Sequence, residues 1–247
     1  MPRKYRITEP GYYHCISRGV ERRNVFLEPD DFDTFLSLFI EIKRDFHLIV
    51  HAYCLMTNHY HILIETTQPN ISTAMQRLNS LYSIYFNKKY KRSGHLWQGR
   101  FHSYYLYDDI HFWYVAKYIE RNPIKASMVE NIIEYPYQSF YERKTYKEAL
   151  LVSNSKIYDM TLQEYENYIS TDLSDDILAK IYDTPKIVQK DGKLTFLYKR
   201  LETLFEEDKD NNRSENAKRA YEYGYTVSEI ASFLNLSHST VSKYVHQ

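Results

Sequence analysis

The chain has 247 residues, enough for one large domain or two smaller ones, and its 43% hydrophobic and 26% charged residues are typical of a soluble globular protein. Its formal net charge is zero, its apolar runs are far too short to span a membrane, and its first residues lack the apolar core of a signal peptide. We therefore expect a cytoplasmic protein that has no membrane partner.

Strand and helix patterns alternate along the first half of the chain. Period-two and period-3.6 patterns predict strands at 11–17, 48–56, 59–65 and 100–107 and helices at about 29–46, 70–92 and 109–121. The first six elements have the order of a split βαβ unit, so the predicted fold class is α+β, a ferredoxin-like antiparallel sheet with two helices on one face. The seventh element, a helix, is available to cover the other face. Cys15 and Cys54 lie in strand-like runs and are expected to be buried thiols.

Basic and aromatic residues share one acid-free stretch of this region. No acidic residue occurs between Glu65 and Asp108, and the basic residues there are Arg77, Lys88, Lys89, Lys91, Arg92 and Arg100. Basic groups bind phosphates and aromatic faces stack on bases, so this composition favours a nucleic-acid contact. The alternative is an ordinary solvated helix end.

The last part of the chain is predicted to be helical. Residues 141–213 contain helical stretches at Ser174–Tyr182 and Leu194–Glu206 between polar segments, and we interpret them as a helical and linker region. Residues 214–247 combine a helix ended by Gly224, a capping box at Thr226 and Glu229, and a last helix at 238–246.

These C-terminal helices have the spacing of a helix-turn-helix module. In that module the last helix lies in the major groove of duplex DNA, and Ser239, Thr240 and Lys243 would face it. The alternative is a helical hairpin that contacts another protein. With residues 1–140 as a first domain, the chain is predicted to have two domains joined by residues 141–213.

The third predicted strand begins with two histidines that could form a metal site. His59 and His61 are two residues apart, so on a strand both point to the same face. Two imidazoles held side by side are good metal ligands. A His-x-His pair also occurs by chance, so the pair alone is weak evidence.

The helix after the fourth strand supplies candidates that could complete this site. Tyr118 and Asn122 are four residues apart and lie on one helical face. The amide oxygen of Asn122 could complete a site for Mg²⁺ or Mn²⁺, and Tyr118 could act as a nucleophile on a phosphate. The alternative for Tyr118 is simple packing, because the chain has 26 tyrosines.

Four blocks of sequence resemble a known family. They are YHCISRG at 13–19, AYCLMTNHYH at 52–61, LWQGRF at 96–101 and YIERNPIKA at 118–126. In this order they resemble the single-tyrosine HUH transposases of insertion sequences, and most closely the REP-associated tyrosine transposases.

The resemblance implies a specific chemistry. The HUH histidines of the family fall on His59 and His61, its nucleophile on Tyr118 and its polar metal ligand on Asn122. The family would use a divalent metal, Mg²⁺ or Mn²⁺, to cleave single-stranded or hairpin DNA through a 5′-phosphotyrosine link. The residues expected to contact this DNA are Arg18, Arg22, Lys88, Lys89, Lys91, Arg92, Arg100 and Arg121. The C-terminal module departs from a minimal transposase and suggests a second contact, with duplex DNA.

Two other functions remain open at this stage. The chain could be a domesticated DNA-binding regulator that keeps the fold without cleavage, or a metal phosphodiesterase without a covalent step. The oligomeric state, a monomer or a homodimer, is also open.

Overall fold

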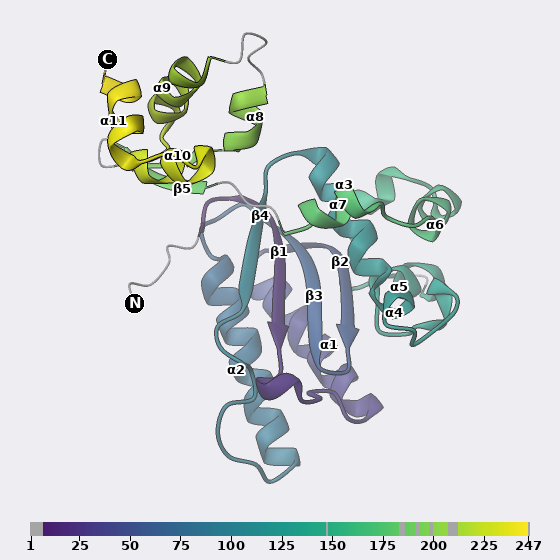
Figure 1. The fold of residues 1–247 in the computed structure, drawn as a ribbon. Helices are drawn as coiled ribbons and strands as arrows, with labels where there is room; N and C mark the ends of the chain where they lie inside the picture. The colour runs from purple at the N-terminus through teal and green to yellow at the C-terminus, as the bar shows by residue number, and fades with distance from the viewer. Residues whose placement is uncertain are drawn as a thin grey trace. The chain divides into compact units, whose positions relative to one another are not determined.

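The computed structural model describes residues 7–146, 148–182, 186–190, 193–197, 200–206 and 212–246. The chain divides into two compact units, one formed by Arg6–Asp183 and the other mostly by Thr184–Gln247. Each unit has its own hydrophobic core, and we describe each by itself (Figure 1).

A four-stranded antiparallel sheet forms the centre of the larger unit. Its strands are β1 (Gly11–Arg18), β2 (Ile49–Met56), β3 (His59–Thr66) and β4 (His102–Leu106), in the order β2-β3-β1-β4. Helix α1 (Pro29–Asp45) connects the first two strands, and α2 (Ile71–Lys89) connects the last two. This is the strand order of the split βαβ unit, so the α+β, ferredoxin-like fold predicted from the sequence is confirmed.

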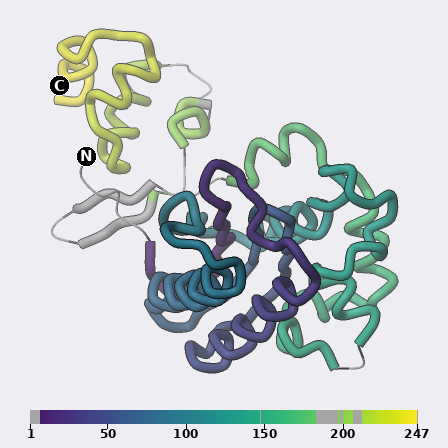
Figure 2. Tube along the Cα trace, turned by 90° about the horizontal axis from the view of Figure 1, so that it is seen from below, coloured from purple at the N-terminus to yellow at the C-terminus, as the bar shows by residue number. Residues whose placement is uncertain are grey.

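The two connecting helices cover one face of the sheet. Helices α1 and α2 contact each other and lie behind the sheet in the view of Figure 1, and they run side by side in Figure 2. Tyr60 of β3 belongs to this face, where its hydroxyl donates to Asn79 of α2 over 2.8 Å and its ring packs on Phe35 of α1. Side chains alternate along a strand, so His59 and His61 point to the opposite face, as the sequence predicts.

The opposite face is covered by helix α3 (Asp109–Glu120), which begins where the Asp108 carboxylate accepts a hydrogen bond from the His111 amide. Its residues Phe112, Val115 and Ile119 pack with Ala52 and Leu63 of the sheet in one core cluster. Burial between the sheet and this helix therefore positions Tyr118 over the face that carries the histidines. Cys15 and Cys54 are buried thiols that form no disulfide, as expected.

Short helices follow α3 within the larger unit. They are α4 (Asn122–Lys125), α5 (Ser139–Thr145), α6 (Leu162–Ser170) and α7 (Asp175–Lys180), with 3-10 turns at Val20–Arg22, Ile132–Glu134 and Lys156–Asp159. Glu120 is fully buried and accepts hydrogen bonds from the Ser139 hydroxyl (2.6 Å), the Phe140 amide (3.1 Å) and the Tyr165 hydroxyl (3.2 Å). Helices α6 and α7, which lie in the region expected to be helical and linker, pack against α3, and the boundary between the units falls inside that region.

The smaller unit begins with a two-stranded hairpin, β5 (Lys186–Lys190) and β6 (Lys193–Leu197), followed by α8 (Leu201–Glu206). The helix predicted at Leu194–Glu206 is therefore wrong in its first part, because residues 193–197 pair with β5 and the helix begins at Leu201. Residues 198–199 and 207–211 lie outside the described part of the chain.

Three further helices complete this unit: α9 (Arg213–Tyr223), α10 (Val227–Leu234) and α11 (His238–His246). The capping box expected at Thr226 and Glu229 is present, and Gly224 ends α9 with a positive φ of 126°. Asn235 adopts the left-handed conformation between α10 and α11, and Val241 is buried where the helices pack. The local geometry is therefore a helix, a tight turn and a second helix. Among the helices that the structure describes, none is long and apolar enough to cross a membrane.

Candidate active site and nucleic-acid interface

His59 and His61 lie on one face of β3, with ring centroids 5.0 Å apart. The strand register places His59 opposite Arg18 of β1 and His61 opposite Ile16. His59 is half-buried, whereas only 3% of His61 is exposed. The sheet therefore holds the two rings next to each other, as the His-x-His spacing predicts.

Hydrogen bonds determine which nitrogen of His59 can bind a metal. Its Nδ1 atom lies 2.5 Å from the Asn58 side-chain oxygen, and the Asn58 amide nitrogen donates to the Arg22 carbonyl over 3.1 Å. The second bond fixes the orientation of the amide, so Asn58 can only accept from His59. Burial, and then the charge of Arg18, lower the pKa of His59 to about 4, so the neutral ring keeps its proton on Nδ1 and leaves a lone pair on Nε2.

His61 has a different partner on Nδ1. This nitrogen lies 2.9 Å from Nε2 of His14, a β1 residue with no exposed surface. Burial lowers the pKa of His61 well below its usual value, and His14, His59 and Arg18 act in the same direction. His61 is therefore neutral at pH 7, and because its Nδ1 atom is engaged with His14, Nε2 is the ring nitrogen that could bind a metal when it carries no proton.

Tyr118 projects from α3 onto these rings and is 9% exposed. Its ring makes an edge-to-face contact with that of His61, with centroids 5.5 Å apart and planes at 89°. Its hydroxyl lies 2.6 Å from that of Tyr182, and the Lys125 ammonium lies 5.6 Å from its ring centroid. Burial first, and the hydrogen bond with Tyr182 second, raise the pKa of Tyr118 above its usual value, so the phenol is protonated at pH 7.

Asn122 begins α4 one turn after Tyr118 and is 7% exposed. Its amide nitrogen donates to the Tyr118 carbonyl over 2.8 Å, which leaves the amide oxygen turned away from that carbonyl. Within the described ranges no three residues of the His, Cys, Asp and Glu types form a metal cluster. A metal beside the histidines would thus need a third ligand of another type, and an amide oxygen suits Mg²⁺ or Mn²⁺.

Comparison with known proteins shows a family likeness in the larger unit. The sequence model for transposases described as IS200-like matches residues 8–122, a range that contains both histidines, Tyr118 and Asn122. This part of the chain is therefore similar to the IS200-like transposases. We call the matched region the transposase domain after that model, and it comprises the sheet, its two connecting helices, α3 and the start of α4.

Individual relatives are distant. A protein of Haemophilus influenzae that carries the name REP-associated tyrosine transposase is 27% identical over 146 residues, which are 54% of this chain and 82% of the relative. A solved structure of a REP-associated tyrosine transposase bound to a REP hairpin is 20% identical, with a TM-score of 0.49 over 59% of this chain and 87% of that chain. A structure from Deinococcus radiodurans described as a transposase is 19% identical, with a TM-score of 0.35 over 49% of this chain and 95% of that chain.

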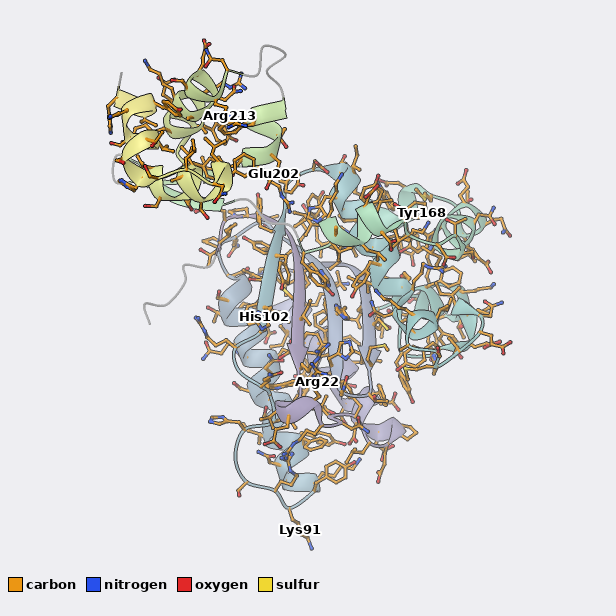
Figure 3. All side chains as sticks on the ribbon, viewed as in Figure 1. Arg22, Lys91, His102, Tyr168, Glu202 and Arg213 are labelled. Atoms are coloured by element: carbon orange, nitrogen blue, oxygen red, sulfur yellow. The ribbon has the colours of Figure 1, made fainter. Side chains whose placement is uncertain are left out.

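Several predicted DNA contacts gather at one end of the transposase domain. Arg18 is the last residue of β1, and Arg22 lies in the 3-10 turn that follows it. The Arg18 carbonyl accepts a hydrogen bond from the amide of Gln98, two residues before Arg100. Lys91 lies at the outer tip of the loop after α2 and points away from the sheet (Figure 3). The exposed basic residues at this end are Arg18, Arg22, Lys88, Lys91 and Arg100. Arg92 is half-buried, with its guanidinium 5.5 Å from the Phe86 ring centroid.

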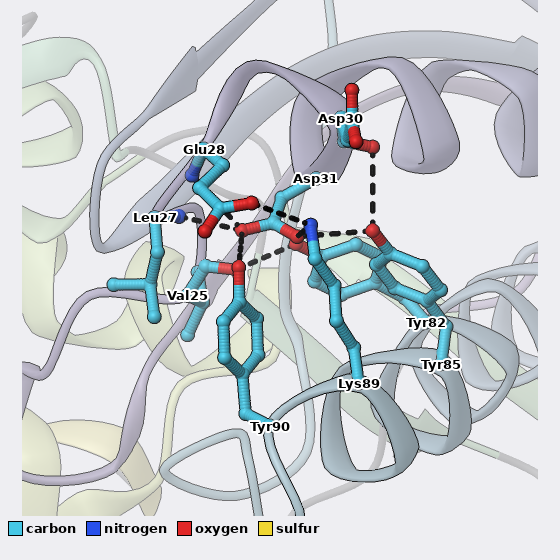
Figure 4. A network of polar contacts seen from close by, with 9 residues as sticks. All are labelled: Val25, Leu27, Glu28, Asp30, Asp31, Tyr82, Tyr85, Lys89 and Tyr90. Carbon is cyan, nitrogen blue, oxygen red and sulfur yellow. Dashed lines mark hydrogen bonds and ion pairs between the residues drawn. The ribbon is translucent and has the colours of Figure 1, made fainter.

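Lys89 is placed differently from its neighbours. Its ammonium lies 2.8 Å from the Asp31 carboxylate and 3.2 Å from that of Glu28, in the network drawn in Figure 4. Asp31 has no exposed surface and also accepts hydrogen bonds from Tyr85, Tyr90 and two backbone amides of the α1 N-terminus. The charge of Lys89 is thus neutralised within the fold, and we do not keep it among the proposed DNA contacts.

Arg121 is also engaged within the protein. Its guanidinium donates to the Ile169 carbonyl (2.9 Å) and the Ser170 carbonyl (2.7 Å) at the end of α6, and forms an ion pair with Asp172. Only 13% of the side chain is exposed. Arg121 therefore joins α3 to α6 in this structure, and its predicted phosphate contact stays a prediction.

The predicted duplex-binding residues lie on α11 of the smaller unit. Ser239 and Lys243 are exposed and Thr240 is half-buried. The hydroxyls of Ser239 and Thr240 each lie 2.8 Å from that of Ser237, whose oxygen also accepts from the Thr240 amide over 3.1 Å. Ser237 thus caps the first turn of α11. Ser239 and Lys243 face the solvent, and Thr240 is partly accessible.

The structure adds three residues that sequence reasoning did not select. His14 and Lys125 lie inside the blocks that resemble the family, and their place in these blocks is a sequence signal that could have indicated them. Tyr182 lies far outside them, and only the packing of residues 171–182 on α3 brings its hydroxyl to Tyr118. No local pattern in the sequence predicts that contact.

Proposed function

We propose that the transposase domain is a metal-dependent endonuclease and strand transferase that cleaves single-stranded DNA through a covalent 5′-phosphotyrosine on Tyr118. One observation carries the proposal: the Tyr118 ring lies against His61, which shares one sheet face with His59. Because packing on α3 would bury a tyrosine without placing its ring against a histidine of the predicted metal pair, this contact supports catalysis over simple packing.

In the proposed reaction the Tyr118 hydroxyl oxygen attacks a backbone phosphorus. The bond from that oxygen to phosphorus forms as the bond to the 3′ oxygen breaks, the phenol loses its proton, and the leaving 3′ oxygen gains one. The phosphotyrosine keeps the energy of the broken ester, so another 3′ hydroxyl can reverse the step and join two strands. No nucleotide cofactor is needed for either direction.

His59, His61 and Asn122 are the residues that would hold the divalent ion, Mg²⁺ or Mn²⁺. When bound, such an ion polarises phosphoryl oxygens and stabilises the charge that develops on them. Arg18 lies opposite His59, and its charge lowers the pKa values of His59 and His61 and also acts to lower that of Tyr118. The Arg18 side chain is therefore suited to hold the phosphate beside the nucleophile.

The substrate proposed is single-stranded DNA with a hairpin. The exposed basic residues at the end of the sheet would follow its backbone, while α11 of the smaller unit would bind duplex DNA. We thus propose two DNA contacts, one for cleavage and one for targeting.

The proposal is tested with labelled single-stranded hairpin DNA and Mn²⁺. The wild-type protein should form a covalent adduct that survives denaturation, whereas Tyr118→Phe should form none. Tyr114→Phe, one turn earlier on the same helix, is the matched control and should retain the adduct. Binding without any cleavage would favour a DNA-binding regulator, and hydrolysis that persists in Tyr118→Phe would favour a phosphodiesterase without a covalent step.

A further inference from the structure

We infer that His14 is a positioning residue that accepts the Nδ1 proton of His61 and thereby keeps Nε2 of His61 free to bind a divalent metal. The inference rests on the proposed function, because it assigns a supporting residue to the same site. It concerns a proton position in the metal-free protein, so it is tested separately.

The geometry leaves two arrangements for the bond between these rings. Nε2 of His14 and Nδ1 of His61 are 2.9 Å apart, so one hydrogen lies between them. If His14 donates it, the neutral His61 ring carries its own proton on Nε2 and cannot use that nitrogen as a ligand. If His61 donates it, Nε2 keeps its lone pair. Only the second arrangement is compatible with a metal on His61.

The surroundings of His14 hold its ring in one orientation. Its ring stacks on that of Tyr182, with centroids 5.9 Å apart and planes at 16°, and it also contacts the rings of Tyr118 and Tyr104. His14 has no exposed surface, so water does not compete for the bond to His61. A ring fixed in this way keeps its Nε2 atom directed at Nδ1 of His61.

His14 therefore has the place that carboxylates and carbonyls often have behind metal-binding histidines. An acceptor on the second ring nitrogen sets the tautomer and raises the basicity of the ligand, and its removal typically weakens metal binding about 10–100-fold. For His59 the side-chain oxygen of Asn58 has the same role. A different neighbour would thus accept the Nδ1 proton of each histidine, and both rings would keep Nε2 for the metal.

The test is ¹⁵N NMR of the histidine rings in the full-length, metal-free protein, together with titration by Mn²⁺ alone. We expect the wild-type His61 ring to carry its proton on Nδ1. In His14→Phe, which keeps a ring but removes the acceptor, this preference should be lost and Mn²⁺ affinity should fall about 10–100-fold. In His14→Gln a side-chain oxygen can accept the proton, so the Nδ1 protonation of His61 and the Mn²⁺ affinity should both largely recover.

His51→Phe is the matched control. His51 is a buried histidine of β2 that is bonded to Glu65 and to residues 155–156, so its loss should leave the His61 tautomer unchanged. A wild-type His61 protonated on Nε2, or a folded His14→Phe protein with unchanged Mn²⁺ affinity, overturns the inference. If the wild-type protein bound no Mn²⁺ while His61 carried its proton on Nδ1, the proposed metal function would fail and the assignment of His14 as acceptor would stand.

Discussion

At the scale of single residues, the protonation state of Tyr118 limits its reactivity as a nucleophile. Burial is the first cause of its raised pKa and the hydrogen bond with the Tyr182 hydroxyl is the second. The phenol is thus a weaker acid than a tyrosine in water. Attack on a phosphate therefore depends on nearby positive charge, which Arg18 supplies in this structure and a bound divalent ion would increase.

Replacement of Tyr182 should change this pKa in a defined way. In Tyr182→Phe the pKa of Tyr118 should fall, because one of the causes that raise it is removed, but it should stay above 10 because burial is the larger cause. Tyrosine ¹³Cζ NMR during a pH titration, with Tyr118→Phe to assign the signal, measures this. An unchanged pKa would show that the hydroxyls do not interact in solution.

The Asp31 carboxylate should contribute to stability in a defined pH range. Burial alone would raise its pKa, but hydrogen bonds from Lys89, the Leu27 amide, Tyr90 and the Glu28 amide outweigh burial and lower it. A carboxyl whose pKa is lowered on folding stabilises the protein fully above its unfolded pKa, about 4, and loses that effect as the pH falls through the lower folded value.

Asp31→Ala should therefore reduce the free energy of unfolding at pH 7 by about 3 kcal/mol and remove this part of the acid dependence. Urea unfolding of the transposase domain in the full chain, at pH 7 and at pH 3, measures both. Asp33→Ala, which removes an exposed carboxylate from the same helix, should cost less than about 0.5 kcal/mol. Equal effects of the two substitutions would exclude a structural role for the network in Figure 4.

At the scale of elements, the contact between α3 and α6 depends on Arg121. Its guanidinium donates through Nη1 to two carbonyls at the end of α6 while Nη2 pairs with Asp172, and a lysine, which has a single nitrogen, cannot reproduce both contacts in this geometry. Arg121→Lys should reduce the free energy of unfolding by about 1–2 kcal/mol in urea titrations. The exposed Arg100→Lys should not. If Arg121→Lys weakened DNA binding and left the stability unchanged, the result would instead support the phosphate contact predicted from the sequence.

Elements that are defined by local patterns were predictable from the sequence. The sheet strands, their two helices and α3 each have an alternation or a helical period, and Asp108, Thr226 and Gly224 mark helix ends. The pair of histidines on one face followed from strand alternation alone. In contrast, residues 193–197 have apolar spacing that also fits a helix, and their pairing with β5 decides the structure.

Contacts between distant segments were beyond the reach of these patterns. His14 and His61 are 47 positions apart, and Tyr118 and Tyr182 are 64 apart. For Lys89 and Arg121 the sequence shows only the positive charge, whereas the partner carboxylates and carbonyls come from other elements. Composition therefore predicted DNA contacts for both residues, whereas the structure shows both side chains bonded to other parts of the protein.

At the scale of the whole molecule, the two units predict two separable DNA activities. Lys243→Ala on α11 should weaken duplex binding and make the slope of log K against log salt less negative by about 1, because one phosphate contact is lost. Cleavage of a short single-stranded hairpin should be unchanged. Lys218→Ala removes an exposed charge from α9 of the same unit and should alter neither. Loss of hairpin cleavage in Lys243→Ala would contradict the separation.

The central claim is that Tyr118 becomes covalently linked to DNA, and mass spectrometry of the digested adduct tests it most directly. After reaction with Mn²⁺ and single-stranded hairpin DNA, the peptide that contains Tyr118 should carry a nucleotide attached through its 5′ phosphate, and the released strand should end in a 3′ hydroxyl. Linkage to another residue, or complete cleavage without any linked peptide, would contradict the account.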